Sequence, residues 1–339
     1  MLDESCIFYK KLSNLIIKSY KYILLISSYF ILMSSFGKIN FKKLFNYHFP
    51  LNSINQKNKI CICSVGKKEN KYIKEYVEHY RNLGVDKIFL YDNNDKKGER
   101  FENVLSEYIK DNYIEIFDYR GKVSPQLKIY EKCYNDNKNN YDWFIFFDTD
   151  EFIHLSNYTN IKDFLNEHKF KNCNLIYFNC VRHTDNNLLY YDNRTLSERF
   201  PIIKWNSSMY TLKTIMRGHN KKHIKFRTTH WLNRGLKKGC NVFGKVVLPT
   251  GRVRLGRNIN HPQHKKYYID HYCFKSTEEY INKINKGDGV FGYNERIKMH
   301  KINLYFNYNK ITLEKINFIE NKTNLNLSRF KLMINNTNG

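Results

Sequence analysis

Between residues 59 and 147, short apolar runs alternate with segments of helical periodicity, and this alternation constrains the fold more than any other feature. The apolar runs predict strands at residues 59–65, 87–91, 113–117 and 143–147. The periodic segments predict helices at residues 70–83, 101–110 and 126–135. A β-α-β-α-β-α-β series of this kind predicts an α/β fold with a doubly wound, mostly parallel sheet that binds ligands at the carboxyl ends of its strands.

Fewer regular elements are predicted after residue 147. We expect a strand at residues 175–179, a helix that begins with the capping sequence Ser276–Glu279 and runs to about residue 286, and a last helix near residues 312–320. The basic stretch between them predicts loops and small antiparallel strands over a site rather than a separate domain. The chain therefore divides into an N-terminal segment (1–58), an α/β domain (59–290) and a C-terminal helical tail (291–339).

The net charge of +25 is concentrated in one stretch. The chain has 57 Lys and Arg against 32 Asp and Glu, and 17 of the basic residues lie between Arg199 and Ile269, where no acid occurs. This leaves 57 − 17 = 40 basic and 32 acidic residues elsewhere, a net charge of only +8. With 42% hydrophobic residues, the chain does not have the composition of an intrinsically disordered protein. We interpret the acid-free stretch as a segment that faces an anion.

The N-terminal segment contains an apolar run at residues 22–36, flanked by lysines. At about 15 residues the run is shorter than the roughly 20 that a spanning helix needs, so a single-pass anchor, an interfacial helix and a soluble helix all remain open. We expect a membrane-associated protein, with the cytoplasmic face favoured and a Golgi-type single-pass protein as the alternative.

The eight cysteines show no CxxC pair and no zinc spacing. Cys61 and Cys63 would point the same way from one strand, a geometry unsuited to bonding each other. We interpret the cysteines as small buried side chains in a reducing compartment.

An acidic cluster follows the most apolar of the predicted strands. Asp148, Asp150 and Glu151 come directly after the run at residues 143–147, at the edge where an α/β sheet binds ligands. Two carboxylates at positions i and i+2 can reach one hard cation. Mn²⁺ or Mg²⁺, completed by diphosphate oxygens, fits this arrangement.

The motifs around this cluster resemble those of a GT-A glycosyltransferase, and more narrowly those of glycosyltransferase family 92 and its family 2-like relatives. The resemblance covers about residues 59–290. It is carried by Lys68-Glu69-Asn70 with Tyr72, Ile73 and Glu75, by Gly84-Val85-Asp86, Tyr91-Asp92-Asn93, Gln126 with Tyr130 and Cys133, Trp143 with Asp148–Phe152, and Asp270–Tyr280 with Lys283 and Gly287.

The resemblance implies a metal-dependent enzyme that transfers a sugar from a UDP-sugar donor. In that family pattern Asp148 and Asp150 hold the metal ion, with His271 as the third ligand, and Asp148 also touches the nucleotide. Further contacts to the nucleotide or its diphosphate are then expected from Glu69, Asp92, Asn93, Lys213 and Lys275. Galactose is the donor sugar that the family suggests, and the acceptor is expected to be a glycan or a lipid-linked saccharide.

The catalytic base of an inverting transfer is harder to predict. Because the stretch from Arg199 to Ile269 contains no acid, the candidates are Asp185, Asp192, Glu198 and Asp270. We favour Asp185 and place Glu198 second. A retaining enzyme would need no such base.

Two other functions remain open at this stage. The net charge and interleaved aromatic residues could mark a nucleic-acid-binding protein, but no RRM, KH or zinc-finger signature is present, and we expect no nucleic-acid partner. A catalytically inactive GT-A fold used as a binding module is the third possibility. The expected partners are a nucleotide-sugar, a saccharide acceptor and a membrane surface.

Overall fold

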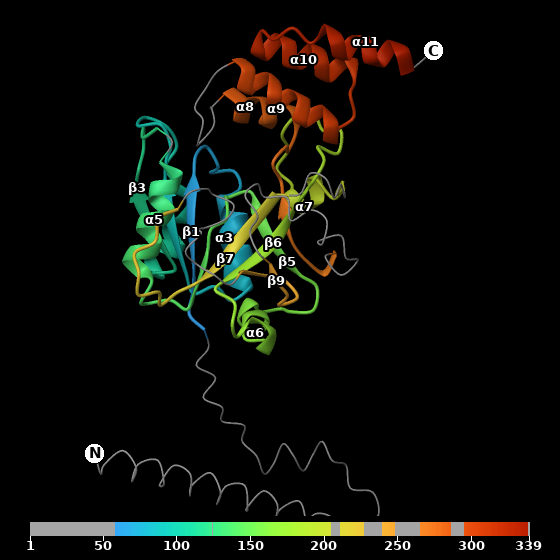
Figure 1. Ribbon diagram of the computed structural model, residues 1–339. Helices are drawn as coiled ribbons and strands as arrows, with labels where there is room; N and C mark the ends of the chain where they lie inside the picture. The colour runs from blue at the N-terminus through green and yellow to red at the C-terminus, as the bar shows by residue number, and fades with distance from the viewer. Residues whose placement is uncertain are drawn as a thin grey trace, which may run out of the picture. The chain divides into compact units, whose positions relative to one another are not determined.

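The structure is a computed structural model that describes residues 58–123, 125–204, 211–226, 239–247, 265–285 and 295–337 (Figure 1). The chain divides into two units, Met1–Gln56 and Lys57–Gly339, and only the second contains described residues. The apolar run at residues 22–36 and much of the acid-free stretch lie outside the described parts. Within those parts, no helix has the length and apolar character needed to cross a membrane.

Strands and helices alternate through the first half of the described chain and helices dominate its end. The strands are β1 (Ile60–Gly66), β2 (Lys87–Asp92), β3 (Ile114–Asp118), β4 (Trp143–Ile145), β5 (Glu151–Leu155), β6 (Leu175–Arg182), β7 (Thr211–Arg217), β8 (Gly239–Asn241), β9 (Val246–Val247) and β10 (Tyr267–His271). The helices are α3 (Ile73–Asn82), α4 (Glu102–Lys110), α5 (Gln126–Asn137), α6 (Ile161–Leu165), α7 (Leu196–Arg199), α8 (Thr277–Asn285), α9 (Glu295–Tyr308), α10 (Leu313–Thr323) and α11 (Ser328–Thr337), with a 3₁₀ turn, η1 (His168–Phe170).

All the strands belong to one sheet with the order β3-β2-β1-β4-β7-β6-β10-β5, and β8 and β9 extend it from β6. The first four strands in the chain pair in parallel, with β1 between β2 and β4. β7 then runs antiparallel between β4 and β6. The α/β class with a mostly parallel central sheet is confirmed, and β7, β5 and β9 are the strands that pair antiparallel with their neighbours.

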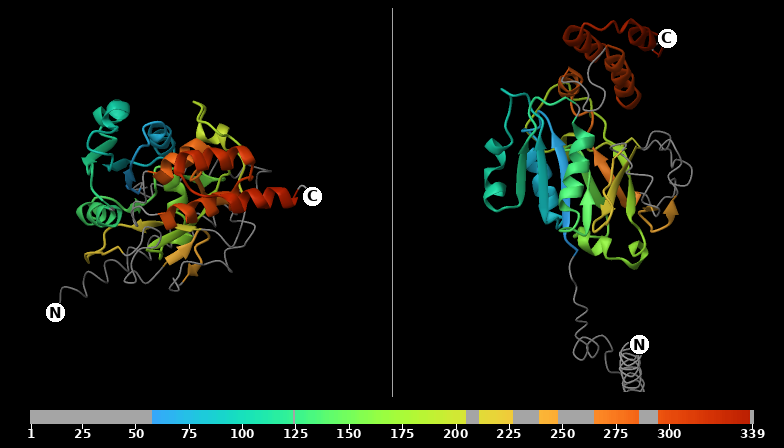
Figure 2. Two further views of the ribbon diagram at one scale, coloured as in Figure 1. Left: turned by 90° about the horizontal axis from the view of Figure 1, so that it is seen from above. Right: turned by 60° about the vertical axis from the view of Figure 1, so that its left-hand side comes forward.

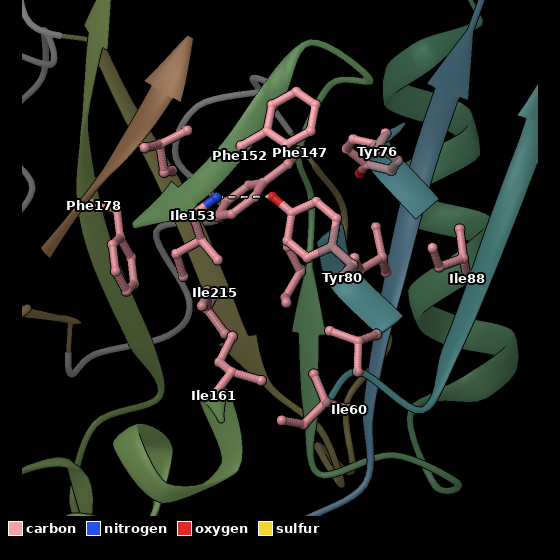
Figure 3. Packing of buried hydrophobic residues seen from close by; sticks show 14 of the residues in the cluster. Ile60, Tyr76, Tyr80, Ile88, Phe147, Phe152, Ile153, Ile161, Phe178 and Ile215 are labelled. Atoms are coloured by element: carbon pink, nitrogen blue, oxygen red, sulfur yellow. Dashed lines mark hydrogen bonds between the residues drawn. The ribbon is translucent and has the colours of Figure 1, made fainter. Parts of the chain in front are cut away.

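Alternate residues of β1 face different helices, as a doubly wound sheet requires. Ile60 and Ile62 belong to the core cluster that includes α3, and Figure 3 shows Tyr80 of this helix bonded to the backbone of Ile153 within the cluster. Cys61 and Cys63 belong to a second cluster that includes α5. The parallel half of the sheet is therefore covered on both faces.

Helix α3 shows why the predicted helices formed. Its buried residues Ile73, Tyr76, Val77 and Tyr80 recur at i, i+3, i+4 and i+7, so one stripe faces the sheet. Gly84 follows the helix with a φ of +90°, a conformation that a residue with a Cβ adopts only with strain.

The predicted elements are present with shifts of a few residues at their ends, but β7 differs from its prediction. The basic stretch was expected to form loops and small strands over a site. Instead, β7 lies inside the sheet, where Ile215 and Met216 are fully buried. Lys213, one of its basic residues, is also fully buried, so a count of charges gave no sign of a central strand here.

The C-terminal helices share a hydrophobic cluster that begins before them. This cluster joins Phe274 and Tyr280 of the α8 region to Tyr305 of α9 and Ile316 of α10. Figure 2 shows these helices, coloured orange to red, lying together at one end of the described domain. The boundary predicted at residue 290 therefore falls inside a continuous core cluster.

The prediction of reduced cysteines is wrong for four residues. Disulfides join Cys63 to Cys133 and Cys173 to Cys240, with Cα–Cα distances of 6.3 and 5.8 Å. The spacing gave no sign of them because each bridge links cysteines about 70 residues apart, 70 in the first case and 67 in the second. Cys61 remains a buried thiol, as predicted.

Candidate functional site

The acidic cluster lies in the turn between β4 and β5, at the carboxyl end of β4. The carbonyl oxygen of Phe147, just before the turn, accepts a 2.7 Å hydrogen bond from the Ser64 hydroxyl of β1. Gly66 ends β1 close by, and a Cβ at this position would lie 2.6 Å from the ring of Phe101 and 3.5 Å from Thr149. A side chain at residue 66 would therefore collide with the Phe101 ring at the start of α4, whereas its distance from Thr149 in the turn would be an ordinary contact.

Asp148 is held from two sides. Its Oδ1 accepts hydrogen bonds from Gln126 Nε2 (2.7 Å) and the Tyr130 hydroxyl (3.2 Å) of α5. Its Oδ2 lies 2.8 Å from Nζ of Lys213 on β7. Burial opposes ionisation, but the Lys213 ammonium holds the pKa of Asp148 below its usual value. The carboxylate is thus charged and fixed in orientation, while a third of the side chain stays exposed.

Asp150 meets residues from the C-terminal motif. Its Oδ2 lies 2.6 Å from Nζ of Lys283 on α8, and its Oδ1 lies 3.6 Å from Nε2 of His271 on β10. Although burial alone would raise it, the charges of Lys283 and neighbouring groups hold the pKa of Asp150 low. Burial lowers the pKa of His271 to about 3, so its imidazole is neutral near pH 7 and offers a nitrogen lone pair.

Glu151 is fully buried behind the two aspartates. Its Oε2 accepts a 3.0 Å hydrogen bond from the backbone N–H of Asp148 and lies 3.0 Å from Nζ of Lys213. Its Oε1 has no hydrogen-bond partner within the described ranges and lies 3.8 Å from Nδ1 of His271. Burial raises the pKa of Glu151 to about 8. Lys213 therefore interacts with the carboxyl groups of both Asp148 and Glu151 and stabilises the turn that carries them.

The predicted set of three metal ligands is not assembled as such. Among the residues that the structure describes, no three His, Cys, Asp or Glu side chains are grouped to hold a metal ion. Asp150 Oδ1 and His271 Nε2 do converge, at 3.6 Å, a separation too long for a hydrogen bond between them. Mg²⁺ sites often use one or two protein ligands plus substrate phosphates. The pair Asp150 and His271 fits such a cation, whereas both oxygens of Asp148 already have partners.

Asp92 and Asn93 end β2 at the same edge of the sheet, but they differ in what they offer. Asp92 is almost completely buried, and its Oδ2 finds no hydrogen-bond partner in the parts of the chain described. Burial raises the pKa of this carboxyl group. Asn93, in contrast, donates its side-chain N–H groups to the carbonyl oxygens of Tyr119 (2.9 Å) and Lys122 (2.8 Å). Asp92 therefore keeps one buried carboxylate oxygen without a partner in the described residues, whereas the Asn93 amide fixes the loop after β3.

The predicted helper residues are engaged with protein groups. Lys275 lies 2.7 Å from Glu69 and 3.7 Å from the centre of the Tyr72 ring, so the predicted contacts Glu69 and Lys275 form a buried pair with each other. Lys213 is fully buried beneath Asp148 and cannot contact a diphosphate directly. We correct its role to that of a counter-ion for the acidic turn.

Asp185, the favoured catalytic base, is a structural residue. Its side chain is buried, and Oδ2 contacts the hydroxyl of Tyr305 on α9 and Nζ of Lys315 on α10, both at 2.5 Å. Its Oδ1 accepts a 2.9 Å hydrogen bond from the backbone of Asn187. Since these groups use both oxygens, the carboxylate anchors the C-terminal helices and is not placed to accept a proton from an acceptor hydroxyl.

Glu198 also has a structural role. It completes a capping box on α7, where its Oε2 accepts hydrogen bonds from the backbone N–H (3.0 Å) and hydroxyl (2.7 Å) of Thr195. These hydrogen bonds lower the pKa of Glu198, the opposite of what a base near neutral pH needs.

The two remaining candidates are paired as well. Asp192 binds Arg194 at 2.7 Å, and this contact lowers its pKa to about 2. Asp270 lies one residue before His271, but its Oδ1 is 2.6 Å from Nε2 of His183. None of the four acids is presented as an unengaged base in the described structure.

Replacing Glu198 by glutamine tests the correction directly. We expect a transfer rate equal to that of the unsubstituted protein, because the side chain only caps a helix on the surface. Loss of a general base would instead slow transfer by roughly 10²–10⁴-fold. A steady-state assay of UDP release distinguishes the two, and a large rate loss would restore Glu198 as the base.

The structure adds four residues to the predicted site: Gln126, Tyr130, Glu151 and Lys283. The sequence carried a signal for each. Gln126 and Tyr130 are spaced i and i+4 on a predicted helix, Glu151 adjoins Asp150, and Lys283 lies in the C-terminal motif. What the sequence did not show is that Lys283 is the partner of Asp150, because 133 positions separate them.

Comparisons with known proteins find relatives in one family of glycosyltransferases. A family 92 protein of Ricinus communis is 28% identical over 110 residues, which are 31% of this chain and 19% of that protein. One of Oryza sativa subsp. japonica is 25% identical over 116 residues, 33% of this chain and 19% of that protein. The matched part thus spans about a fifth of these relatives. Among solved structures, Staphylococcus aureus TarS 1–349 in complex with UDP-GlcNAc is 12% identical with a TM-score of 0.35, covering 78% of this chain and 79% of that chain.

A family-wide comparison covers far more of the chain than these pairwise matches. The family sequence model of glycosyltransferase family 92 matches residues 57–326, from the start of the α/β domain through α10. Because this match includes most of the chain, the protein belongs to glycosyltransferase family 92.

Proposed function

We propose that this protein transfers a sugar from a UDP-sugar to a hydroxyl group of a glycan or a lipid-linked saccharide. Family membership supports glycosyl transfer as the reaction class. The observation that carries the donor assignment is the convergence of Asp150 and His271 at the carboxyl edge of the parallel strands, where Asp92 also offers a buried oxygen. UDP-galactose is the finer proposal for the donor and rests on the family resemblance alone.

The chemistry explains why such residues are needed. Transfer breaks the bond between the sugar and the diphosphate, and negative charge develops on the leaving oxygen. Mn²⁺ or Mg²⁺, held by Asp150 and His271, would supply a Lewis acid for that charge. The protein contributes orientation: Lys283 fixes Asp150, while Gln126, Tyr130 and Lys213 fix Asp148.

We further propose an inverting reaction and attachment to a membrane surface through residues 22–36. Both proposals rest on the sequence and its family resemblance. The configuration of the anomeric carbon in the product, measured by NMR, decides the first. Sedimentation of the full chain with lipid vesicles decides the second.

A thermal-shift experiment tests the donor proposal. At a concentration one hundred times its Kd, a ligand of the folded state stabilises it by about 2.7 kcal/mol, so UDP with Mn²⁺ should raise Tm by about 5 °C. UDP with EDTA should raise Tm less, because the diphosphate would then face Asp150 without a cation. ADP and GDP are the controls.

Each outcome has a defined meaning. No shift from UDP contradicts the nucleotide-sugar donor, and equal shifts from ADP or GDP contradict a uridine-specific pocket. Equal shifts in Mn²⁺ and EDTA contradict metal dependence. Binding of UDP without any release of UDP from UDP-sugars would favour the inactive binding module.

A further inference from the structure

We propose that the Cys63–Cys133 disulfide positions Asp148 for donor binding, so that the oxidised protein is the form that binds the nucleotide. The inference rests on the proposed function, because Asp148 lies beside Asp150 in the acidic turn where that function places the donor, with a third of its side chain exposed. It adds a covalent link from the sheet to the helix that holds this aspartate, and it makes binding dependent on redox state.

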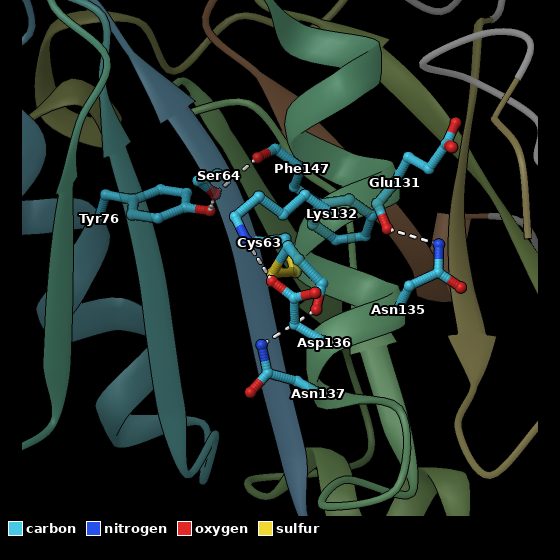
Figure 4. The surroundings of a disulfide bond; sticks show 10 residues. Cys63, Ser64, Tyr76, Glu131, Lys132, Asn135, Asp136, Asn137 and Phe147 are labelled. Atoms are coloured by element: carbon cyan, nitrogen blue, oxygen red, sulfur yellow. Dashed lines mark hydrogen bonds and ion pairs between the residues drawn. A yellow bond between two sulfur atoms is a disulfide. The ribbon is translucent and has the colours of Figure 1, made fainter. Parts of the chain in front are cut away.

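The disulfide joins the central strand of the parallel half to α5. Cys63 lies in β1 and Cys133 in α5, both are fully buried, and their Cα atoms are 6.3 Å apart. Figure 4 shows the bond between β1 and the helix, with Ser64 beside it on the strand. The bridge therefore fixes the distance of α5 from β1 at one point along the helix.

The same face of α5 holds Asp148. Gln126, Tyr130 and Cys133 are spaced i, i+4 and i+7, which places them in one row along the helix. Gln126 Nε2 and the Tyr130 hydroxyl both donate to Asp148 Oδ1, and Gln126 also donates to the Tyr130 oxygen at 3.0 Å. A shift of α5 away from β1 would withdraw both donors from Asp148 together.

The strand side of the bridge leads to the same aspartate. Ser64, next to Cys63, donates its hydroxyl to the carbonyl oxygen of Phe147, the residue before Asp148 (Figure 4). The backbone before Asp148 is thus held by β1 and its carboxylate by α5, and the disulfide fixes these two supports to each other. An oriented carboxylate at a donor site loses less entropy on binding than a mobile one.

The second disulfide provides a matched control. Cys173–Cys240 spans 67 residues against 70 for Cys63–Cys133, so the two bridges constrain the unfolded chain to a similar degree. Cys173 precedes β6, and the first residue of β6, Leu175, pairs with Met216, as does Phe144 of β4. The control bridge therefore lies at the amino ends of β4 and β6, at the edge of the sheet opposite Asp148.

The inference also bears on the compartment in which the protein works. Disulfides persist in the secretory lumen and outside the cell and are rare in the cytosol. Two buried bridges favour the lumenal, Golgi-type alternative over the cytoplasmic face that the cysteine spacing suggested.

The experiment compares two double variants of the full chain, Cys63→Ala with Cys133→Ala and Cys173→Ala with Cys240→Ala. Tm and the Kd for UDP in Mn²⁺ are measured for both. We expect both variants to melt earlier, but only the first to bind UDP more weakly, by about tenfold, since it loosens two hydrogen bonds to a charged group. Gln126→Ala, with both disulfides intact, should reproduce part of this loss without the fall in Tm.

A second measurement covers the case in which the first double variant does not fold. Dithiothreitol reduces the unsubstituted protein by thiol–disulfide exchange: the S–S bond breaks, two electrons and two protons pass to the cysteines, and the reagent closes to its own cyclic disulfide. Alkylation and mass measurement identify which bridge has opened. Binding of UDP should weaken when the Cys63–Cys133 bridge opens and recover on reoxidation.

Equal UDP affinity in the two double variants, or unchanged affinity after the Cys63–Cys133 bridge has opened, would overturn the inference. If the unsubstituted, oxidised protein does not bind UDP at all, the proposed function fails and this inference fails with it. The unsubstituted protein therefore separates the two failures.

Discussion

Replacing Asp150 by asparagine is expected to abolish sugar transfer while leaving the fold intact. The substitution keeps the shape of the side chain but removes the charge that faces His271 and Lys283. A cation held by Asp150 and His271 would lose the carboxylate, which is the anionic ligand of the two. Stabilisation of the leaving diphosphate by such a cation is worth several kcal/mol. We expect kcat/KM to fall by about a thousandfold or more, measured as UDP release with Mn²⁺, donor and acceptor present.

The fold should survive because Lys283 keeps a route to water. A third of its side chain is exposed, so its ammonium can be solvated when Asp150 no longer neutralises it. Asp111→Asn is the matched control: this aspartate is about half exposed and pairs with Arg81 at 3.0 Å on the surface. Full activity in the Asp150 variant would refute the metal assignment, and loss of activity in the Asp111 variant would show that the assay reports folding.

Local patterns account for the parts of the fold that were predicted. The strands and helices from β1 to β4 follow one another in sequence order, so each is defined by its own periodicity and by turns such as Gly84. The α/β GT-A fold class is confirmed by their parallel pairing and by the family match. β7 was not predicted as a sheet strand, because its neighbours β4 and β6 lie far from it in sequence and its buried Lys213 is paired only through tertiary contacts.

In the candidate site, too, only the features defined by neighbouring residues could be predicted. Asp148 and Asp150 adjoin one strand, so their place at its carboxyl end could be predicted from the sequence. The partners that decide what each acid does are far away: Asp185 meets Tyr305 and Lys315 across 120 or more positions. Asp185 was predicted as the base from its position in the sequence. The sequence does not show that both oxygens of this carboxylate have hydrogen-bond partners.

The structure also changes the interpretation of the acid-free basic stretch, which was expected to face an anion. Lys213 and Arg199, both from the acid-free stretch, are fully buried and paired with acids outside it, Asp148 and Glu279 respectively. Part of the basic excess in that stretch therefore neutralises carboxylates of the domain itself. A basic surface over the diphosphate remains a prediction for the residues that the structure does not describe.

Replacing Asp185 by alanine is expected to lower the free energy of unfolding more than any of the substitutions proposed above. The substitution would leave Lys315, which is only 3% exposed, as an unpaired cation in the core and would remove the acceptor for the Tyr305 hydroxyl. Breaking a buried ion pair in this way costs about 3–5 kcal/mol, a large part of the roughly 5–15 kcal/mol that stabilises a typical domain. Tm should therefore fall by about 10 °C, and denaturant unfolding measures the change in free energy.

The same variant separates anchoring from catalysis, because the two roles predict opposite pairs of results. An anchor predicts a large fall in Tm with a nearly unchanged kcat at a temperature where the variant is folded. A general base predicts a fall in kcat of roughly 10²–10⁴-fold, with stability loss only incidental. Tyr305→Phe is the control for the anchor, since it removes the two hydrogen bonds of the hydroxyl, with Asp185 and Thr277, but keeps the pair of Asp185 with Lys315, and it should lower stability by only about 2 kcal/mol. An Asp185 variant that kept the Tm of the unsubstituted protein and lost its activity would contradict the anchor and return the carboxylate to the catalytic site.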